Sequence, residues 1–170
     1  MAFSNEYIGS LFVRYKGRGI LIDANLLLLY FVGMYDPRMI LSFKRTRVFV
    51  PEDFDLLLRF FSYFGKVVTT PNILTEVNGF SNHLPENIKP QYYSEFGKQI
   101  SVLEEEYTAS AKICSLDHFS KFGLTDSGII DLVRGKYLVL TQDFKLANYL
   151  QNAGIDAINF NHIRTLNWNN

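Results

Sequence analysis

The stretch Gly19-Ile20-Leu21-Ile22-Asp23-Ala24-Asn25 decides how this sequence folds. Its continuous apolar run is typical of a strand that is buried on both faces of a parallel sheet. The run ends at the carboxylate of Asp23, and the carboxamide of Asn25 follows two positions later. In open α/β sheets, ligands bind in the crevice outside the carboxyl ends of the strands. The stretch therefore predicts an α/β fold with a polar site at one edge of its sheet.

Strands and helices are predicted to alternate along the rest of the chain. Apolar runs indicate further strands, and amphipathic stretches between them indicate helices. This alternation predicts a three-layer α/β/α sandwich with a mostly parallel central sheet. The expected strands are residues 19–24, 66–70, 137–141 and 156–160. The expected helices are residues 25–35, 54–64, 91–113, 124–135 and 144–153, with one more after Pro71. We expect 38–50 to be a connection or short hairpin, Thr125 to be a helix N-cap, and Glu104 to Glu106 to face solvent from helix 91–113.

The length and composition are those of one globular domain. The 170 residues are 48% hydrophobic, which is enough to bury a single core. We expect residues 1–18 to form an N-terminal amphipathic extension and residues 19–170 to form a single domain. The extension is predicted to pack on the domain edge, with a surface for a partner chain as the alternative.

Charge and cysteine content exclude several classes of protein. Seventeen basic and seventeen acidic residues cancel, so no global field directs the chain to nucleic acid or to a membrane. The single Cys114, which we expect in the core, excludes an intrachain disulfide and a cysteine-based zinc site. The sequence shows no signal peptide and no apolar run long enough to span a bilayer. We therefore expect a cytoplasmic protein without a membrane partner.

Four carboxylates are predicted to meet at the carboxyl edge of the sheet. Asp23 and Asp143 follow predicted strands. Glu76 lies in the first turns of the helix after the second strand, and Asp126 lies at a helix start. Any one of them could simply cap a helix, form a turn or face solvent. Two carboxylates about 4 Å apart repel by roughly 1–4 kcal/mol, so a cluster of four needs cations or protons.

An all-oxygen cluster of this kind suits Mg²⁺ or Mn²⁺ and favours phosphoryl chemistry. The sequence contains no Gly-rich phosphate loop and no Ser-His-Asp constellation that would compete with this interpretation. His83, His118 and His162 are isolated in the sequence, and we expect them to be structural or surface residues.

Four ordered motifs resemble those of the PIN domain family, over residues 19–162. The motifs are Ile22-Asp23-Ala24-Asn25, Pro71-Asn72-Ile73-Leu74-Thr75-Glu76, Leu124-Thr125-Asp126-Ser127 and Val139-Leu140-Thr141-Gln142-Asp143-Phe144. The order of the acids carries the resemblance more than any single motif does. The resemblance implies an α/β/α sandwich and Mg²⁺- or Mn²⁺-dependent endoribonuclease activity on RNA. Many bacterial members are toxins of toxin–antitoxin pairs, which implies an antitoxin protein as partner and leaves a homodimer open.

The resemblance also implies a role for individual residues. The catalytic metal ligands, directly or through water, would be Asp23, Glu76, Asp126 and Asp143. Asn25 and Thr141 would orient these carboxylates or a bound water. Asp131 lies about 140° around the helix from Asp126, so we expect it at the periphery of the site.

Two other functions stay open on the sequence alone. A PIN-like module that holds protein or RNA without cutting is suggested by the aromatic residues Tyr92, Tyr93 and Phe96, which we expect to be exposed. A phosphohydrolase of the haloacid dehalogenase type would need an Asp at the position of Asn25, so the sequence disfavours it. Candidate phosphate contacts, each more simply explained as solvated surface, are Lys44, Arg45, Arg47, Lys121 and Lys145.

Overall fold

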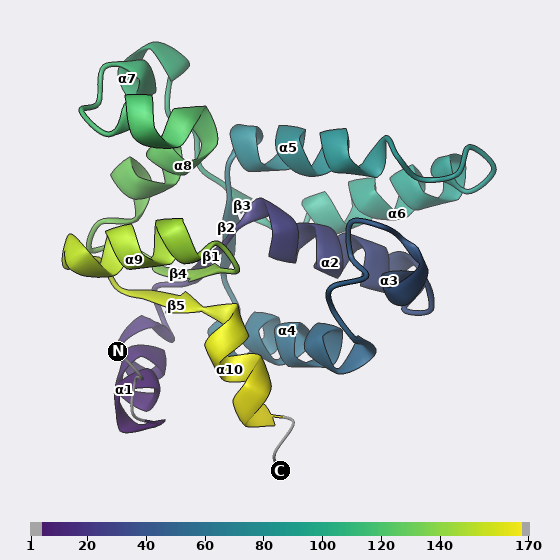
Figure 1. Cartoon of the computed structure of the whole chain (residues 1–170), viewed down its shortest axis with the longest axis horizontal. Helices are drawn as coiled ribbons and strands as arrows, with labels where there is room; N and C mark the ends of the chain where they lie inside the picture. Colours follow the sequence, from purple (N-terminus) through teal and green to yellow (C-terminus); the bar gives the residue numbers. More distant parts are fainter. Residues whose placement is uncertain (1–4, 168–170) are drawn as a thin grey trace.

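The computed structural model describes residues 5–167 and places side chains from Glu6 to Arg164. Its sheet consists of β1 (Ile20–Ile22), β2 (Val67–Thr69), β3 (Glu104–Glu105), β4 (Leu138–Thr141) and β5 (Ala157–Asn159). The strand order is β3-β2-β1-β4-β5, and all neighbouring pairs are parallel. The predicted α/β fold, with helices flanking a parallel sheet, is confirmed (Figure 1).

Helices cover both faces of this sheet. Within the described residues they are α1 (Asn5–Tyr15), α2 (Ala24–Tyr35), α3 (Met39–Ser42), α4 (Pro51–Phe64), α5 (Pro71–Ser81), α6 (Lys89–Ile100), α7 (Ser110–Cys114), α8 (Phe119–Val133), α9 (Phe144–Asn152) and α10 (Phe160–Asn167). The helices α2, α4 and α6 lie on one side of the sheet, and α8 and α9 lie on the other (Figure 1). Right-handed crossovers require this division, because the chain builds β1 to β3 in one direction and β4 to β5 in the other. None of the described helices is long and apolar enough to cross a membrane.

The central strand β1 and the helix that follows it form the middle of the core. Ile20, Leu21 and Ile22 are completely buried, and Ile20 is in register with residues of both β2 and β4. Burial of each such side chain contributes about 1.5–3 kcal/mol. In α2 the run Leu26 to Leu29 is buried on every side of the helix, as expected for a helix without a polar face. At Gly33 a Cβ atom would lie 2.4 Å from the ring of Phe54, so glycine permits the close crossing of α2 and α4.

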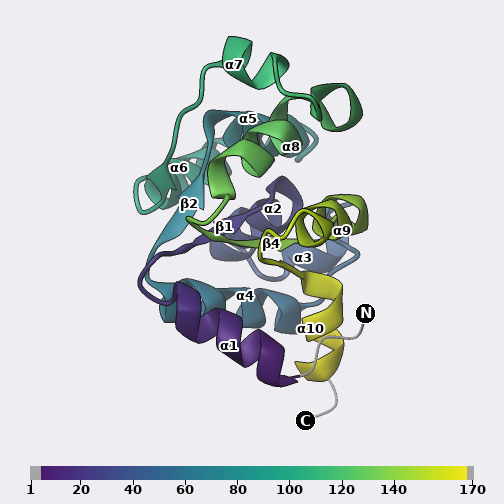
Figure 2. The same ribbon diagram turned by 90° about the vertical axis from the view of Figure 1, so that its left-hand side faces the viewer.

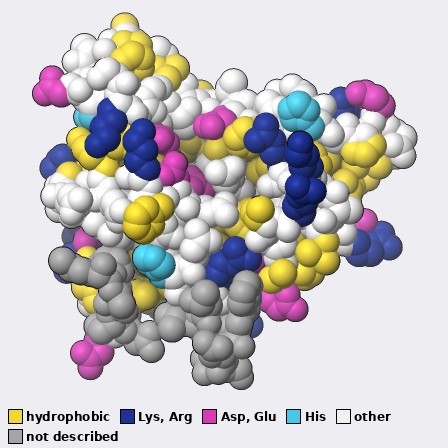
Figure 3. Space-filling view, in the orientation of Figure 1, with side chains coloured by type: hydrophobic (Ala, Val, Ile, Leu, Met, Phe, Trp, Pro, Cys, Tyr) yellow, Lys and Arg dark blue, Asp and Glu magenta, His cyan; other side chains and the backbone are white. Residues whose placement is uncertain are grey.

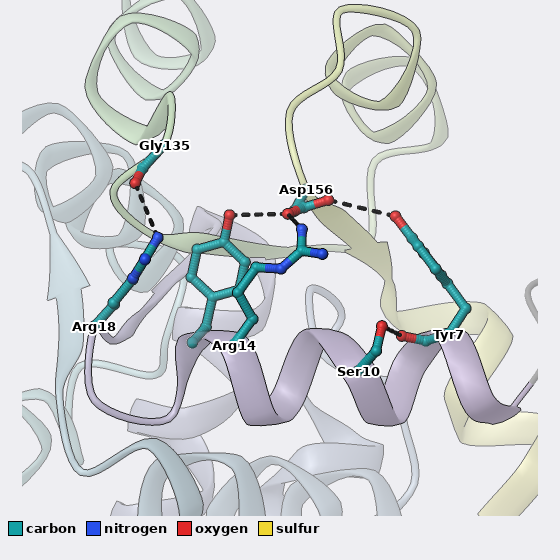
Figure 4. Close-up of polar contacts among 7 residues, drawn as sticks. Tyr7, Ser10, Arg14, Arg18, Gly135 and Asp156 are labelled. Atoms are coloured by element: carbon teal, nitrogen blue, oxygen red, sulfur yellow. Dashed lines mark hydrogen bonds and ion pairs between the residues drawn. The ribbon is translucent and has the colours of Figure 1, made fainter.

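The N-terminal helix α1 is attached to the domain by a polar contact and an aromatic one. The guanidinium of Arg14 and the hydroxyl of Tyr15 donate to one carboxylate oxygen of Asp156, at 2.8 and 2.9 Å (Figure 4). Tyr7 donates to the other oxygen at 3.4 Å. Phe12 packs against the aromatic rings of α4, which lies beside α1 in Figure 2. The expected helix on the domain edge is therefore present, although residues 1–4 of the extension lie outside the described residues.

The region predicted as one helix over 91–113 is divided into three elements. Helix α6 ends at Ile100, the short edge strand β3 follows, and α7 comes after it. Glu104 and Glu105 are exposed, as expected, but they pair with β2 instead of lying on a helix. The amide of Glu106 donates to the carbonyl of Thr69 at 2.9 Å. The open edge of β2 offers backbone partners that outweigh the helix propensity of three glutamates.

Two aromatic residues that we expected to be exposed are buried. Tyr92 and Phe96 are 1% and 8% exposed, while Tyr93 is half-buried. The ring of Phe96 lies 4.3 Å from that of Phe31 in α2, and the hydroxyl of Tyr92 hydrogen-bonds to that of Ser81 at 2.8 Å. The spacing of four residues places both aromatic rings on the face of α6 that covers α2.

The segment 38–50 is a connection, one of the two expected alternatives, and it contains α3 and a series of turns. Two smaller predictions differ from the structure. Cys114 is exposed at the end of α7 instead of lying in the core. Helix α8 begins at Phe119, and Gly123 interrupts it with a φ of 71°. Thr125 therefore lies inside α8, two residues after this break, instead of at the N-cap of the helix.

Candidate active site

The strand order reverses between β1 and β4, so their carboxyl ends form the topological switch point of the sheet. Ligands of open α/β sheets bind outside the strands at such a point. Asp23 comes directly after β1, and Asp143 comes two residues after the end of β4. The two predicted acids therefore lie side by side for a topological reason.

The carboxylate of Asp23 connects the two strands. Asp23 is 5% exposed, and its Oδ1 accepts a hydrogen bond from the amide of Leu26 at 2.9 Å, which caps α2. Its Oδ2 accepts from the hydroxyl of Thr141 and, at 2.8 Å, from the amide of Gln142. Burial raises the pKa of Asp23, although these hydrogen bonds act in the opposite direction. The side chain is thus fixed in position by both of the elements it joins.

Thr141 also holds Asp143. The hydroxyl oxygen of Thr141 accepts a hydrogen bond from the amide of Asp143 at 2.9 Å while its proton is donated to Asp23. Asp143 is exposed, and its Oδ1 caps α9 by accepting from the amide of Leu146 at 3.0 Å. A single buried hydroxyl group thereby orients the carboxylate of Asp23 and fixes the backbone of Asp143 at the switch point.

Asp126 faces these acids from α8. Burial raises the pKa of Asp126, and the negative charge of Asp143 adds to the shift. Glu76 and Asp23 raise it further, so that the pKa reaches about 7. The positive charge of Lys145 lowers it. The negative charges of all three other predicted acids therefore act on the carboxyl group of Asp126.

Glu76 approaches the site from a third helix. It lies on α5, and partial burial of its carboxyl group raises its pKa. The charge of Asp23 raises the pKa as well, whereas a hydrogen bond from the side chain of Thr125 lowers it. Glu76 therefore faces α8, the helix with which α5 is in contact.

The charges of the other three acids raise the pKa of Asp126, but the four carboxyl groups are not gathered around one point. Among the described residues, no three acidic, histidine or cysteine side chains are grouped closely enough to hold a metal ion. Carboxylates without a counter-charge repel one another and have no reason to approach more closely. Their assignment as metal ligands stays a prediction.

The other residues singled out in the sequence lie around this group. Asn25 is exposed on the first turn of α2. Asp131 forms an ion pair of 2.8 Å with Lys112 of α7. The Nε2 atom of His118 lies 3.4 Å from the carbonyl oxygen of Ser127. Asp131 is therefore engaged in joining α7 to α8.

A cleft of about 950 Å³ opens beside the acids. Asn25 and Gln142, the neighbours of the switch-point acids, line this cleft. It is also lined by residues of the segment 43–48, which follows α3, and by His83, which lies between α5 and α6. The sequence did not predict that His83 and Gln142 line the same cleft. For Gln142, its position directly before Asp143 was a signal that it lies near the acids; His83 has no such signal.

No protein-family model, curated protein or solved structure matches this chain. What the site can do chemically follows from its own groups. The four acids offer only oxygen donors, which suit hard divalent cations. The neighbouring cleft brings cationic side chains, which suit an anionic ligand. Such groups suit a divalent cation together with an anionic ligand.

Proposed function

We propose that this chain is a Mg²⁺- or Mn²⁺-dependent endoribonuclease of the PIN type. The observation that carries the proposal is the electrostatic coupling of Asp126 to three other acids at the switch point of the sheet. The order of the four acidic motifs in the sequence supports the same conclusion. Phosphodiester hydrolysis is a reaction for which a carboxylate-held cation at a strand edge is suited.

The donor set fits the proposed cation. The residues that would hold it are Asp23, Glu76, Asp126 and Asp143. All their donors are carboxylate oxygens, and the repulsion among them is what a divalent cation relieves. When bound, Mg²⁺ or Mn²⁺ supplies positive charge at the phosphodiester and lowers the pKa of a water molecule.

The chain's own groups orient these carboxylates before the substrate arrives. Thr141 donates to the carboxylate of Asp23 and accepts from the amide of Asp143, and the amides of Leu26 and Gln142 also donate to Asp23. Such supporting hydrogen bonds set the direction of ligand oxygens and reduce the reorganisation that binding requires. The exposed amide of Asn25, next to Asp23, would contact the substrate at the end of the cleft.

Incubation of the full chain with end-labelled, unstructured RNA tests the proposal. We expect cleavage with Mg²⁺ or Mn²⁺ and none with EDTA. Asp126→Asn should lose more than the roughly 10- to 100-fold that is typical for a residue that only supports a ligand. Asp131→Asn, on the same helix but paired with Lys112, is the matched control and should cleave normally. Cleavage that survives Asp126→Asn or EDTA would remove the metal mechanism.

A toxin role is part of the same proposal. RNA cleavage in the cytoplasm would stop the growth of cells that express the chain, and an antitoxin protein would suppress the effect. Asp126→Asn, expressed to the same level, should leave growth unchanged. Growth arrest by that variant would separate any toxicity from the acids.

The second candidate function is a PIN-like module that binds RNA or protein without cutting. The spacing of the acids favours it, because no three of the described side chains are grouped for a metal ion. Titration calorimetry with Mn²⁺ separates the two candidates. Heat of binding that disappears in Asp126→Asn supports the nuclease, and absence of binding by the unaltered chain supports the module.

A further inference from the structure

A rigid turn presents three cations beside the acidic edge. We call residues 43–49, between α3 and α4, the basic turn. Every third residue of it is buried, namely Phe43, Thr46 and Phe49. The residues between these anchors include three exposed cations, Lys44, Arg45 and Arg47. The buried anchors therefore force the charged side chains outward.

Hydrogen bonds and ring packing hold the basic turn in place. The hydroxyl of Thr46 donates to the carbonyl of Ile40 at 2.8 Å. The guanidinium of Arg164, on α10, donates to the carbonyl of Val48 at 3.0 Å. The ring of Phe49 packs edge-on against that of Phe160. Since the turn is fixed on three sides, a ligand would not have to order its backbone on binding.

The three cations have no acidic partner. None of them forms an ion pair with a described residue. Arg45 stacks on the ring of Phe80 at 4.7 Å, and that contact leaves its charge uncompensated. No described residue that lines the cleft is Asp or Glu. Among the described residues that line the cleft, the charged side chains are therefore the three cations of the basic turn, although the chain as a whole has no net charge.

The cleft reaches the sequence neighbours of the acids. Asn25 and Gln142, which line it, lie two residues after Asp23 and directly before Asp143. In Figure 3, acidic side chains lie between two separate groups of Lys and Arg side chains. Beyond the acids, the exposed ring of Phe144 is 63% accessible at the start of α9. A ligand that passes along this surface meets cations, then the acids, then an aromatic ring.

We propose that the cleft binds the phosphate backbone of an unpaired RNA strand that continues past the acids to Phe144. This inference rests on the proposed function for RNA as the ligand class. Phosphates in the cleft would contact Lys44, Arg45 and Arg47. A base can stack on the open ring of Phe144 only when it is not paired, and such stacking is the usual means of holding single strands. An acidic peptide could pair with the three cations, but its carboxylates would not stack on the ring of Phe144.

Fluorescence anisotropy of a labelled oligouridylate of about twelve nucleotides measures this binding. The parent is the full chain carrying Asp126→Asn, in EDTA, so that no RNA is cut. The test variant adds Lys44→Ala, Arg45→Ala and Arg47→Ala. The control variant instead adds Arg59→Ala, Arg134→Ala and Lys136→Ala. These control residues are exposed and remove the same charges from α4 and from the turn before β4, outside the cleft.

The salt dependence of the affinity provides the expected magnitude. Each single-strand phosphate contact contributes about 0.7 to the slope of log affinity against log salt. Loss of three contacts should flatten the slope by about 2. Between about 50 and 200 mM salt the parent should then lose about 20-fold more affinity than the test variant. The control variant should keep the slope of the parent, and Phe144→Ala should weaken binding without changing the slope.

Several results would overturn the inference. These are absence of oligouridylate binding by the parent, an equal effect of both triple variants, equal affinity for a duplex of the same length, or equal affinity for oligoglutamate. If loss of the Arg45–Phe80 contact unfolds the test variant, Lys44→Ala with Arg47→Ala should still flatten the slope by about 1.4. Binding that behaves as expected in a chain that cuts no RNA would refute the proposed nuclease and leave the cleft assignment intact.

Discussion

Replacing Asp126 by Asn should stabilise the metal-free protein and remove its response to Mn²⁺. In the metal-free chain Asp126 is partly buried and lies in the field of three other acids, which raises its pKa from 3.8 to about 7. Above that pH its negative charge opposes folding. Asparagine has the same shape without the charge, so the substitution relieves the repulsion. It also removes a carboxylate that the proposed cation would bind.

The size of the effect follows from the pKa. A shift from 3.8 to about 7 corresponds to about 4 kcal/mol at 1.36 kcal/mol per pKa unit. Because the acidic edge is open to water, which screens these charges, we expect about 2 kcal/mol at pH 8. The folded pKa lies above the unfolded one, so the folded state binds the proton more tightly. The unfolding free energy of the unaltered chain should therefore fall as pH rises from about 4 to 7.

Urea unfolding followed by circular dichroism measures these free energies. In EDTA the unaltered chain should be more stable at pH 5 than at pH 8, and this difference should be smaller in Asp126→Asn, where the raised pKa values of Asp23 and Glu76 remain. Mn²⁺ at about 100 times its dissociation constant should stabilise the unaltered chain by about 2.7 kcal/mol and the variant by much less. Asp131→Asn is the control. Its half-exposed ion pair with Lys112 contributes about 0–1 kcal/mol, and its Mn²⁺ response should be normal.

Two results would refute the reasoning. One is an Asp126→Asn protein that is less stable than the unaltered chain in EDTA at pH 8, which would mean that the carboxylate is stabilising. The other is an unchanged Mn²⁺ response of that variant, which would place any metal site elsewhere.

Three further predictions concern the support of the site and the fold. Arg164→Ala leaves the 1%-exposed carboxylate of Asp53 without its ion pair and should cost about 3–5 kcal/mol in urea unfolding; a loss below about 1 kcal/mol would contradict this. Thr141→Val removes the hydroxyl that donates to Asp23, so the free energy of unfolding should fall by about 1–3 kcal/mol. RNA cleavage should fall as well, and unchanged cleavage would show that the hydroxyl does not orient the site. Asp156→Ala removes the polar attachment of α1 and should speed proteolysis of that helix, with equal digestion rates as the contrary outcome.

The parts of the fold that depend on local sequence could be predicted. Ile20 to Ile22 form an uninterrupted apolar run, and the strand boundary falls at the first charged residue. Leu138 to Leu140 form a second apolar run, and β4 ends at the polar Thr141, two residues before Asp143. Because parallel strands all end at one edge, the meeting of Asp23 and Asp143 followed from these two boundaries. The helix cap at Asp23 also follows from local chemistry, since its carboxylate accepts from the amide three residues on.

The parts that depend on tertiary contacts could not be predicted. Strand β3 has two exposed glutamates, and only the open edge of β2 makes them a strand. The rings of Tyr92 and Phe96 have helical spacing, but that spacing does not tell which face of α6 meets α2. The cleft joins the basic turn to His83 and Gln142. No pattern within any one of these segments predicts that they approach one another.

The bond between Asp23 and Thr141 has a consequence for protein synthesis. The two residues are 118 positions apart in the chain, yet their hydrogen bond closes the switch point. While a ribosome is still adding residues before β4, Asp23 can cap α2 but has neither Thr141 nor Asp143 beside it. For a chain that cuts RNA, this delay keeps the nascent polypeptide inactive next to the messenger that encodes it. Under the proposed nuclease function, the order of strands in the sheet would thus also set the moment at which activity begins.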